Sequence, residues 1–389
     1  MFKDKKSILT FLITLILSIL FIFIGYNYLK TPPSEKENEV YTATITDITD
    51  IKYDETFLNE DDTPIKNKTI FFEAKLTKGP EKGKIVKMSQ YFDYLYVSQP
   101  KEIKKNERIL VTALPDPETN VLTWTFVEHN RTIPLLVLLA VFLLIILIIG
   151  RGKGVATILS LALTTCAIFL LYIPSIFIGK NIYLSTIIIT FFIILTSLIL
   201  LNGLNKKAIC AIIGNMGGVL VAGLLAIIMN KLLHITGIVD ENYVYLMMMN
   251  PKIKIDLQAI VWGGLLIGSL GAIMDVAMSI SSAMNELSIA MENKTMKKMV
   301  KAGMNIGRDA IGTMTNTLVL AYIGSSLATV LLLFAYNKNL VHLFSMEMIA
   351  IEVLKAIIGS IGSLFSVPIT VIFSAYLFNK KDYKYKKSN

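Results

Sequence analysis

Long uninterrupted runs of apolar residues dominate the chain and predict its main architecture. A run of about 20 apolar residues is long enough for a helix to cross a hydrocarbon core about 30 Å thick. Eight segments meet this requirement, and they are 8–29, 133–150, 155–178, 182–201, 208–231, 258–282, 311–335 and 349–378. The pattern therefore predicts a polytopic α-helical membrane protein.

The first apolar segment follows Lys3, Lys5 and Lys6, which resemble the basic start of a signal peptide. Its apolar stretch is longer than that of a typical signal peptide, and no small-x-small cleavage motif follows it. We therefore expect residues 1–30 to remain attached as a transmembrane anchor.

Alternating polar and apolar residues replace the long apolar runs between residues 31 and 131. Short strands rich in β-branched and aromatic residues are expected near 40–48, 70–76, 84–88, 109–113 and 122–126. Five such strands predict a small β-barrel of the OB-like or SH3-like type. The full domain plan is an anchor at 1–30, a β domain at 31–131, a seven-helix transmembrane domain at 132–378 and a basic tail at 379–389.

An aromatic cluster in this β domain leaves two interpretations open. Tyr91, Phe92, Tyr94 and Tyr96 lie close together in the sequence. They can stack on the rings of a bound oligomer, or they can pack a barrel wall and rest on lipid headgroups. The second interpretation is the simpler one, because a barrel needs apolar side chains in its wall whatever its function.

Composition agrees with the apolar pattern. Hydrophobic residues make up 54% of the 389 residues and charged residues only 17%, with a net charge of +9. Soluble proteins carry about 25% charged residues. These values exclude a soluble enzyme, a disordered scaffold and a nucleic-acid-binding domain as first interpretations.

The basic residues are distributed unevenly between the two sets of loops, which predicts an orientation. The flanks on one side hold 17 Lys and Arg residues, and the short loops on the other side hold 5. Both termini are therefore expected in the cytoplasm, with residues 31–131 outside. The net positive charge then lies at the inner membrane face, where anionic lipid attracts it. The lipid bilayer is the expected partner, and nucleic-acid binding is not needed to explain the charge.

The sequence contains no visible metal, cofactor or nucleotide site. The two cysteines, Cys166 and Cys210, lie inside apolar runs, and His129, His234 and His342 are far apart. No spacing of these residues matches a metal site, and no Walker A motif is present. No nucleophile–base pair is evident either. We therefore expect no cofactor and no enzymatic activity.

One predicted helix carries a stripe of small residues with one carboxylate in it. The successive gaps along this stripe are three or four residues, which places its members within one arc of about 80°. They are Gly264, Gly268, Gly271, Asp275, Ser279, Ser282 and Glu286. Small faces let membrane helices approach closely, so the glycines and serines are expected to pack against another helix.

Asp275 is the strongest candidate for a functional residue. A carboxylate at this depth costs roughly 2.5–3.5 kcal/mol on insertion scales. Its ionisation would be costly away from water, so it can take up and release a proton near neutral pH. The functional interpretation is a proton or ion relay, and the structural one is a buried carboxyl that holds helices together.

Other polar residues are expected at about the same depth. Asn215 lies about seven residues and Asn316 about five residues from the same ends of their predicted spans, and Thr313 and Thr315 flank Asn316. At about 1.5 Å per residue they can form one polar layer with Asp275 in the cytoplasmic half of the membrane. Each amide can equally satisfy a carbonyl of its own helix.

The segment 284–307 alternates methionines with lysines and predicts an amphipathic helix at the cytoplasmic interface. Glu286, Arg308 and Asp309 are expected as charges at helix starts. Near the end of the chain, Glu352 and Lys355 are spaced to form an i,i+3 ion pair.

Two stretches resemble the YibE/F family of multi-pass membrane proteins. They are 264–283 (GLLIGSLGAIMDVAMSISSA) and 307–326 (GRDAIGTMTNTLVLAYIGSS), and the similarity extends over about 40–378. The resemblance implies a bacterial cell-membrane protein with several spans. A weaker resemblance, to the resistance–nodulation–division and SecD/SecF group, implies that Asp275 couples protons. This chain has one such carboxylate and not a pair.

The first functional hypothesis is a permease or export component driven by an ion gradient through Asp275. The second is a non-transporting membrane scaffold whose outside β domain binds a partner protein or envelope polymer. An oligomer is compatible with either hypothesis. A polar cavity that reaches Asp275 favours the first, and a solid interior with a groove on the β domain favours the second.

Overall fold

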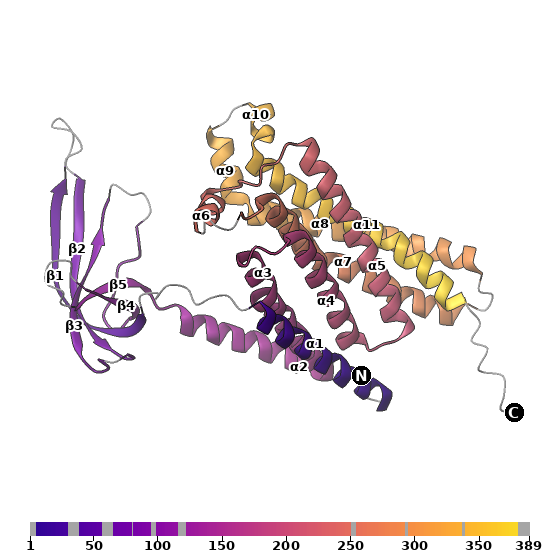
Figure 1. The fold of residues 1–389 in the computed structure, drawn as a ribbon, viewed down its shortest axis with the longest axis horizontal. Coiled ribbons are helices and arrows are strands. Elements are labelled where there is room, and N and C mark those ends of the chain that lie inside the picture. Colours follow the sequence, from indigo (N-terminus) through magenta and orange to yellow (C-terminus); the bar gives the residue numbers. More distant parts are fainter. Residues whose placement is uncertain are drawn as a thin grey trace. The chain divides into compact units, whose positions relative to one another are not determined.

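The computed structural model describes residues 5–29, 39–56, 65–79, 81–94, 99–115, 122–249, 254–291, 295–336 and 339–379. The chain divides into a β unit, Pro32–Leu144, and a helical unit made of Met1–Thr31 and Ile145–Asn389 (Figure 1). The predicted basic tail beyond residue 379 and Tyr96 lie outside the described residues.

The β unit contains one five-stranded antiparallel sheet. Its strands are β1 (Val40–Thr56), β2 (Ile65–Leu76), β3 (Ile85–Phe92), β4 (Arg108–Pro115) and β5 (Leu122–His129). They are ordered β3-β2-β1-β4-β5 (Figure 1). All five predicted strands are therefore confirmed.

The long strand β1 joins the two halves of this sheet. Its first five residues, 40–44, pair with β4, and the strand pairs with β2 from Ala43 to Thr56. Register shifts at Ile45/Asp47 and Ile48/Asp50 interrupt the second pairing. Such bulges bend a strand and increase its twist, which lets one strand serve both neighbours.

The core of the β unit follows the alternation of its strands. Residues of β3 are exposed and buried in strict alternation. Fully buried side chains such as Ile45, Phe72 and Ile109 fill the interior. Of the predicted aromatic cluster, Phe92 belongs to this core, whereas Tyr91 and Tyr94 are exposed.

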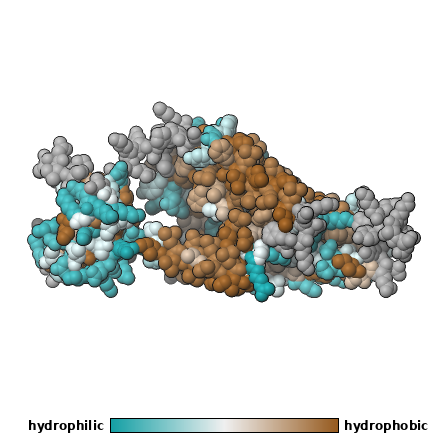
Figure 2. Space-filling view, turned by 90° about the horizontal axis from the view of Figure 1, so that it is seen from below, coloured by the Kyte–Doolittle hydropathy of each residue, from teal (hydrophilic) through white to brown (hydrophobic). Residues whose placement is uncertain are grey.

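The helical unit is built from long apolar helices, and Figure 2 shows the hydrophobic surface that they present. They are α1 (Lys5–Tyr28), α2 (Thr132–Ala167) with η1 (Ile168–Tyr172) and α3 (Ile173–Phe177), α4 (Ile182–Asn202), α5 (Lys206–Leu232), α7 (Leu257–Ala290), α8 (Met296–Ser325) and α11 (Glu347–Asn379). The first part of α2, up to Leu144, belongs to the β unit. Shorter helices are α6 (Glu241–Met249), α9 (Leu327–Tyr336) and α10 (Leu340–Ser345).

Among the described residues, six helical stretches are long and apolar enough to cross a membrane. The bent pair α8 and α9 makes a seventh when it counts as one span. One of the six, Thr132–Phe177, has 46 residues. An unbroken helix of that length would measure about 69 Å, more than twice the thickness of a hydrocarbon core.

This long stretch is broken at Arg151, whose φ of 48° and ψ of −127° are not helical. A side chain at Gly154 would collide with the carbonyl oxygen of Ile146. In a straight helix, residues eight positions apart lie about 12 Å from each other. The chain therefore turns sharply here, between the two segments that the sequence predicted as separate spans.

Side-chain caps explain where several of these helices begin. Asn181, Asn205, Asp256 and Thr295 each accept a hydrogen bond from a backbone N–H in the first turn. The caps satisfy donors that have no partner inside the helix. They place the starts of α4, α5 and α7 within two residues of the polar-to-apolar changes in the sequence. Helix α8 begins earlier than its predicted span.

Helices α5, α7 and α11 pack closely through glycines. A Cβ on Gly218 of α5 would lie 2.5 Å from the carbonyl oxygen of Gly362 and 2.8 Å from Cγ2 of Ile273. Neither contact can be relieved without moving backbone or a fully buried side chain. This three-helix contact forms the rigid centre of the helical unit.

Residues 284–307 do not form the separate amphipathic helix that the sequence predicted. Met284 lies within α7, and α8 begins at Met296 and continues to Ser325. Met284 and Met299 are fully buried with Val371 of α11 in one cluster. The apolar stripe faces a neighbouring helix of the same chain, so it is not available for the lipid interface.

Helix α1 packs against α4 as an integral part of the helical unit. The hydroxyls of Ser18 and Thr196 lie 3.1 Å apart, within hydrogen-bond distance. The rings of Phe21 and Phe192 stack with their centroids 4.6 Å apart. The predicted anchor is therefore held by specific contacts as well as by its hydrophobicity.

Candidate functional site

The small-residue stripe of α7 is open. The glycines, Asp275, Ser279 and Glu286 of the stripe are exposed, and Ser282 is half-buried. A Cβ on Gly264 or Gly271 would meet no other atom within 4 Å, and one on Gly268 would meet the hydroxyl of Tyr322 at 3.3 Å. Among the described residues, Gly264 and Gly271 therefore pack against no other helix, whereas Gly268 approaches α8. Packing of the whole stripe stays a prediction. The residues that do pack lie on the opposite face of α7.

Asp275 projects from this open face. Its side chain is exposed and has no hydrogen bond or ion pair with any described residue. Ile273, two positions earlier and thus about 200° around the helix, is fully buried against α5. The carboxylate therefore points away from the packed centre of the helical unit.

Helix α8 runs antiparallel to α7 and brings further polar residues to the same level. Ile280 approaches Gly307, and Gly268 approaches Tyr322. Interpolating between these contacts places Asp275 level with Thr313, about one turn from Asn316. Thr313 and Asn316 are exposed.

Thr315 and Asn215 differ from these exposed residues. Thr315 is half-buried, and its hydroxyl has no partner among the described residues. Asn215 is fully buried on α5, near the contact of Gly218 with Ile273, and its amide has no described partner either. Asp275 lies on the opposite face of α7 from this contact. The predicted polar layer is therefore divided: Asn215 lies in the interior, and Asp275 lies on the open face.

The three charges predicted at helix starts lie inside helices. Glu286 is near the end of α7, and Arg308 and Asp309 lie more than three turns after the start of α8. Arg308 donates a hydrogen bond from Nη1 to Oδ1 of Asn305 at 3.2 Å. The predicted start of this helix was too late. The lysines in the first turns of α8 hid the fact that these turns and the apolar span form one helix.

A polar cavity lies where the stripe begins. It has a volume of about 430 Å³, and its lining includes Tyr243, Gly264, Tyr322, Ser326, Glu352 and Lys355. The predicted ion pair is present, with 2.6 Å between Nζ of Lys355 and Oε1 of Glu352. Ser326 donates a hydrogen bond to the other oxygen of Glu352.

The cavity adjoins a broken helix. Helices α8 and α9 meet at Ser326 with a bend of 65°. Sequence reasoning placed Glu352 and Lys355 in one pair but missed Tyr243, Tyr322 and Ser326. The Gly-Ser-Ser run at 324–326 could have pointed to Ser326, because small polar residues interrupt a span there.

A comparison with protein-family models identifies the helical part of the chain. The model described as YibE/F-like protein matches residues 138–380. The chain belongs to the YibE/F-like family. The match covers the α7 stripe, the polar residues of α8 and the cavity of this YibE/F-like protein. No curated protein and no solved structure gave a match.

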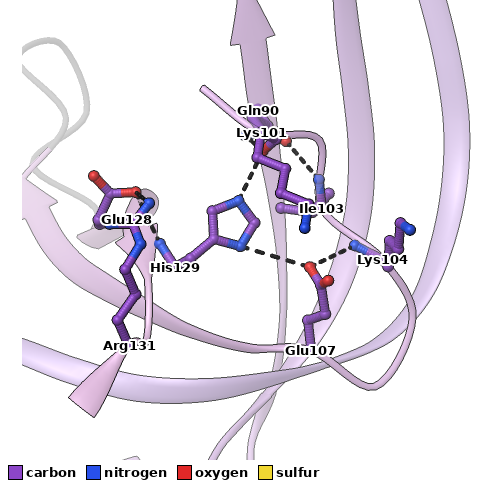
Figure 3. Close-up of polar contacts among 8 residues, drawn as sticks. All are labelled: Gln90, Lys101, Ile103, Lys104, Glu107, Glu128, His129 and Arg131. Carbon is purple, nitrogen blue, oxygen red and sulfur yellow. Dashed lines mark hydrogen bonds and ion pairs between the residues drawn. The ribbon is translucent and has the colours of Figure 1, made fainter. Parts of the chain in front are cut away.

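The β unit of this YibE/F-like protein holds its own polar network around His129 (Figure 3). Nε2 of His129 lies 2.7 Å from the carbonyl oxygen of Lys101, and Nδ1 lies 3.5 Å from Oε2 of Glu107. Gln90 donates to the same Lys101 carbonyl at 3.0 Å. The network fastens the end of β5 to the loop that leads into β4.

Two ion pairs of the β unit shift pKa values in opposite directions. A hydrogen bond from Lys68 to Glu102, 2.6 Å long, raises the pKa of Lys68. A hydrogen bond from Lys105 holds the pKa of Asp47 below its ordinary value. In the described residues, no group of three or more His, Cys, Asp or Glu side chains is arranged to hold a metal ion.

Proposed function

We propose that this YibE/F-like protein is an ion-coupled permease or export component of the cell membrane. In this proposal the chain crosses the membrane eight times, with both termini in the cytoplasm and the β unit outside. Asp275 takes up and releases the coupling proton or ion. The protein catalyses no covalent reaction in this scheme.

The excess of basic residues on one side supports the orientation. The sharp turn at Arg151 supports the count of eight, because each half of Thr132–Phe177 is then long enough for one crossing. Arg151 and Lys153 lie at this turn, which suits a cytoplasmic loop. The long, bulged β1 supports an OB-like barrel for the β unit.

One observation carries the proposal: Asp275 lies on an open, glycine-lined face of a membrane-length helix and has no hydrogen-bond or ion-pair partner among the described residues. Glycines leave space beside the carboxylate, and lipid chains would have to fill that space against an unfavourable polar group. A water-filled path or a moving element solves this problem. A sealed structural carboxylate would instead have hydrogen-bond partners.

A cysteine accessibility experiment tests this proposal without knowledge of the substrate. In a chain with Cys166 and Cys210 replaced by serine, Asp275→Cys is treated in vesicles with a membrane-impermeant methanethiosulfonate. Such reagents need the thiolate, which forms in water and not in lipid. We expect Asp275→Cys to react.

Leu220→Cys is the matched control. Leu220 of α5 is 61% exposed and lies two positions beyond Gly218, at about the depth of Asp275. Its thiol should stay unmodified because it faces lipid. Equal resistance of both cysteines would overturn the water-accessible relay.

A flux measurement tests the coupling itself. Vesicles that contain the protein and a pH-sensitive dye should dissipate an imposed pH gradient faster than vesicles with Asp275→Asn. Asp275→Glu keeps a titratable carboxyl and should retain part of the flux. Equal fluxes for all three chains would exclude Asp275 as the coupling group.

The second candidate is a non-transporting scaffold whose β unit binds a partner protein or an envelope polymer. The observation that favours it is the exposure of Tyr91 and Tyr94, at 54% and 46%. Exposed aromatic rings are suited to stacking on a polymer or a partner. Replacing both with serine should abolish this function and leave the flux of the first candidate unchanged.

A further inference from the structure

The cavity at the α8–α9 break contains an ion pair in its wall. Glu352 and Lys355 lie one turn apart on α11, and both reach its wall. Their side chains are only 19% and 22% exposed. Isolated charges this poorly hydrated are unfavourable, and a buried pair is often no more stable than two apolar residues of similar size. Stability alone therefore does not explain the pair.

The groups that line this cavity retain unused hydrogen-bonding capacity. Lys355 has three N–H donors, and its only described partner is Glu352. The hydroxyl of Tyr322 is buried and has no partner among the described residues. Tyr243 faces the same space from α6. A cation, a carboxylate and phenol groups thus converge on one volume.

The net charge of these lining groups is zero, which restricts the ligand. A simple anion would be attracted by Lys355 but repelled by Glu352 at 2.6 Å from it, and a simple cation would meet the reverse. A molecule that carries both charges can pair its negative group with Lys355 and its positive group with Glu352. No charge is then left without a partner. The volume of about 430 Å³ suits a small molecule.

We propose that this cavity binds a small zwitterion, of the class that carries one ammonium and one carboxylate group. Lys355 and the hydroxyl of Tyr322 bind its carboxylate. Glu352 and the ring of Tyr243 bind its ammonium group, since aromatic faces attract cations. Ser326 holds Glu352 in place at the break between α8 and α9.

The cavity and the open face of α7 share one residue. Gly264 belongs to both, and Asp275 lies eleven positions further, about 16 Å along the helix. Transport of the zwitterion rests on the proposed function, with Asp275 as the coupling group. Binding of the zwitterion does not, because none of the binding groups is Asp275.

Equilibrium binding to the full-length protein in lipid nanodiscs tests this inference. The probes are radiolabelled glycine, L-alanine, L-leucine and glycine betaine, with methylammonium and acetate as single-charge controls. We expect at least one zwitterion to bind saturably and both single-charge probes to fail. Lys355→Met should weaken binding by at least about tenfold, through loss of a charge-assisted hydrogen bond.

Two further variants guard against misfolding and non-specific loss. Glu352→Gln combined with Lys355→Met leaves no unpaired charge, so this double variant should fold and yet fail to bind. Lys180→Met removes a lysine that lies 4.9 Å from the ring of Tyr28, elsewhere in the helical unit. It should bind like the parent chain.

Three results would overturn the inference: no zwitterion binds, methylammonium or acetate binds as well as the zwitterions, or the double variant binds normally. Asp275→Asn separates this inference from the proposed function. Binding by Asp275→Asn with loss of coupled flux supports both. Normal coupled flux in Asp275→Asn, together with binding that depends on Lys355, would retain the cavity and reject the relay.

Discussion

Glycines have opposite effects at the two faces of α7. On the packed side, Gly218 of α5 and Gly362 of α11 lie so close to each other and to Ile273 that no methyl group fits. On the open side, a methyl group on Gly264 or Gly271 would touch nothing within 4 Å. The same residue type thus permits close contact in one place and leaves empty space in the other.

This difference shows what a small-residue stripe does and does not mean. Spacing of three or four residues says that the residues share a face, but packing depends on whether another helix presents a complementary surface. On the open face the space lies beside a carboxylate. Packing explains Gly218 and Gly362, whereas Gly264 and Gly271 pack against none of the described residues.

The strongest way to break the comparison is to add bulk on each face. Gly218→Val forces a side chain into the carbonyl oxygen of Gly362, and overpacking of this kind costs about 1–3 kcal/mol or more. We expect a lower unfolding temperature and a lower yield of monodisperse protein in detergent. Gly271→Val is the matched control and should fold like the parent chain. Equal damage by both variants would mean that the open face is covered in the native protein.

Loss of a hydrogen bond on the packed face should have a smaller effect. Trp262 is 4% exposed, and its Nε1 donates to the carbonyl oxygen of Gly223 at 2.9 Å. Trp262→Phe keeps most of the packing but removes this bond, which contributes about 1 kcal/mol. Thermal unfolding checks the change. Trp124→Phe in the half-buried wall of the β unit is a suitable control for loss of one indole, and it should leave unfolding of the helical unit unchanged.

Two serines of α7 sharpen the comparison further. Ser281 donates a hydrogen bond from Oγ to the carbonyl oxygen of Lys207 at 2.6 Å, whereas Ser279 lies on the open face. Ser281→Ala should destabilise the fold by about 0.6 kcal/mol, the average for hydrogen bonds between membrane helices. Ser279→Ala should leave stability unchanged. A larger loss for Ser279→Ala would place an unrecognised partner against the open face.

The smallest expected effect concerns an exposed ion pair of the β unit. Lys105 donates a 2.8 Å hydrogen bond to Asp47 and lowers the pKa of Asp47 below 3.8. Because the folded pKa is the lower one, the pair stabilises the folded unit above about pH 3.8. That contribution disappears as the pH falls through the folded value. Asp47→Asn should remove this part of the pH dependence. Unfolding temperatures of the parent chain and of the variant, measured between about pH 3 and pH 6, check this expectation.

Local patterns were sufficient to predict most of the elements. Apolar runs located α1, α4, α5, α7 and α11, and alternation located the five strands. The boundary between α7 and α8 was predicted poorly because Met284 and Met299 alternate with charges, as residues of a lipid-surface helix do. Their true partner, Val371, is distant in the sequence, and nothing in the local pattern points to it.

The candidate site was predictable in its residues but not in its geometry. The spacing identified Asp275, Glu352 and Lys355 as unusual charges in apolar surroundings. It could not say which side of α7 would be covered, because that depends on the paths of α5 and α11. The cavity also needs Tyr243 from a separate short helix, and no periodicity connects Tyr243 with Glu352.

The attachment of α1 has a consequence for how the molecule is made. Ser18 is 4% exposed and lies within hydrogen-bond distance of Thr196 on α4, and Ile22 is 9% exposed in a cluster that includes residues of α4. Proteolytic removal of residues 5–28 during biogenesis would leave the hydroxyl of Thr196 facing hydrocarbon with no hydrogen-bond partner from that helix. Because α1 precedes α4 in the chain, its packing contacts can form only after α4 has been inserted.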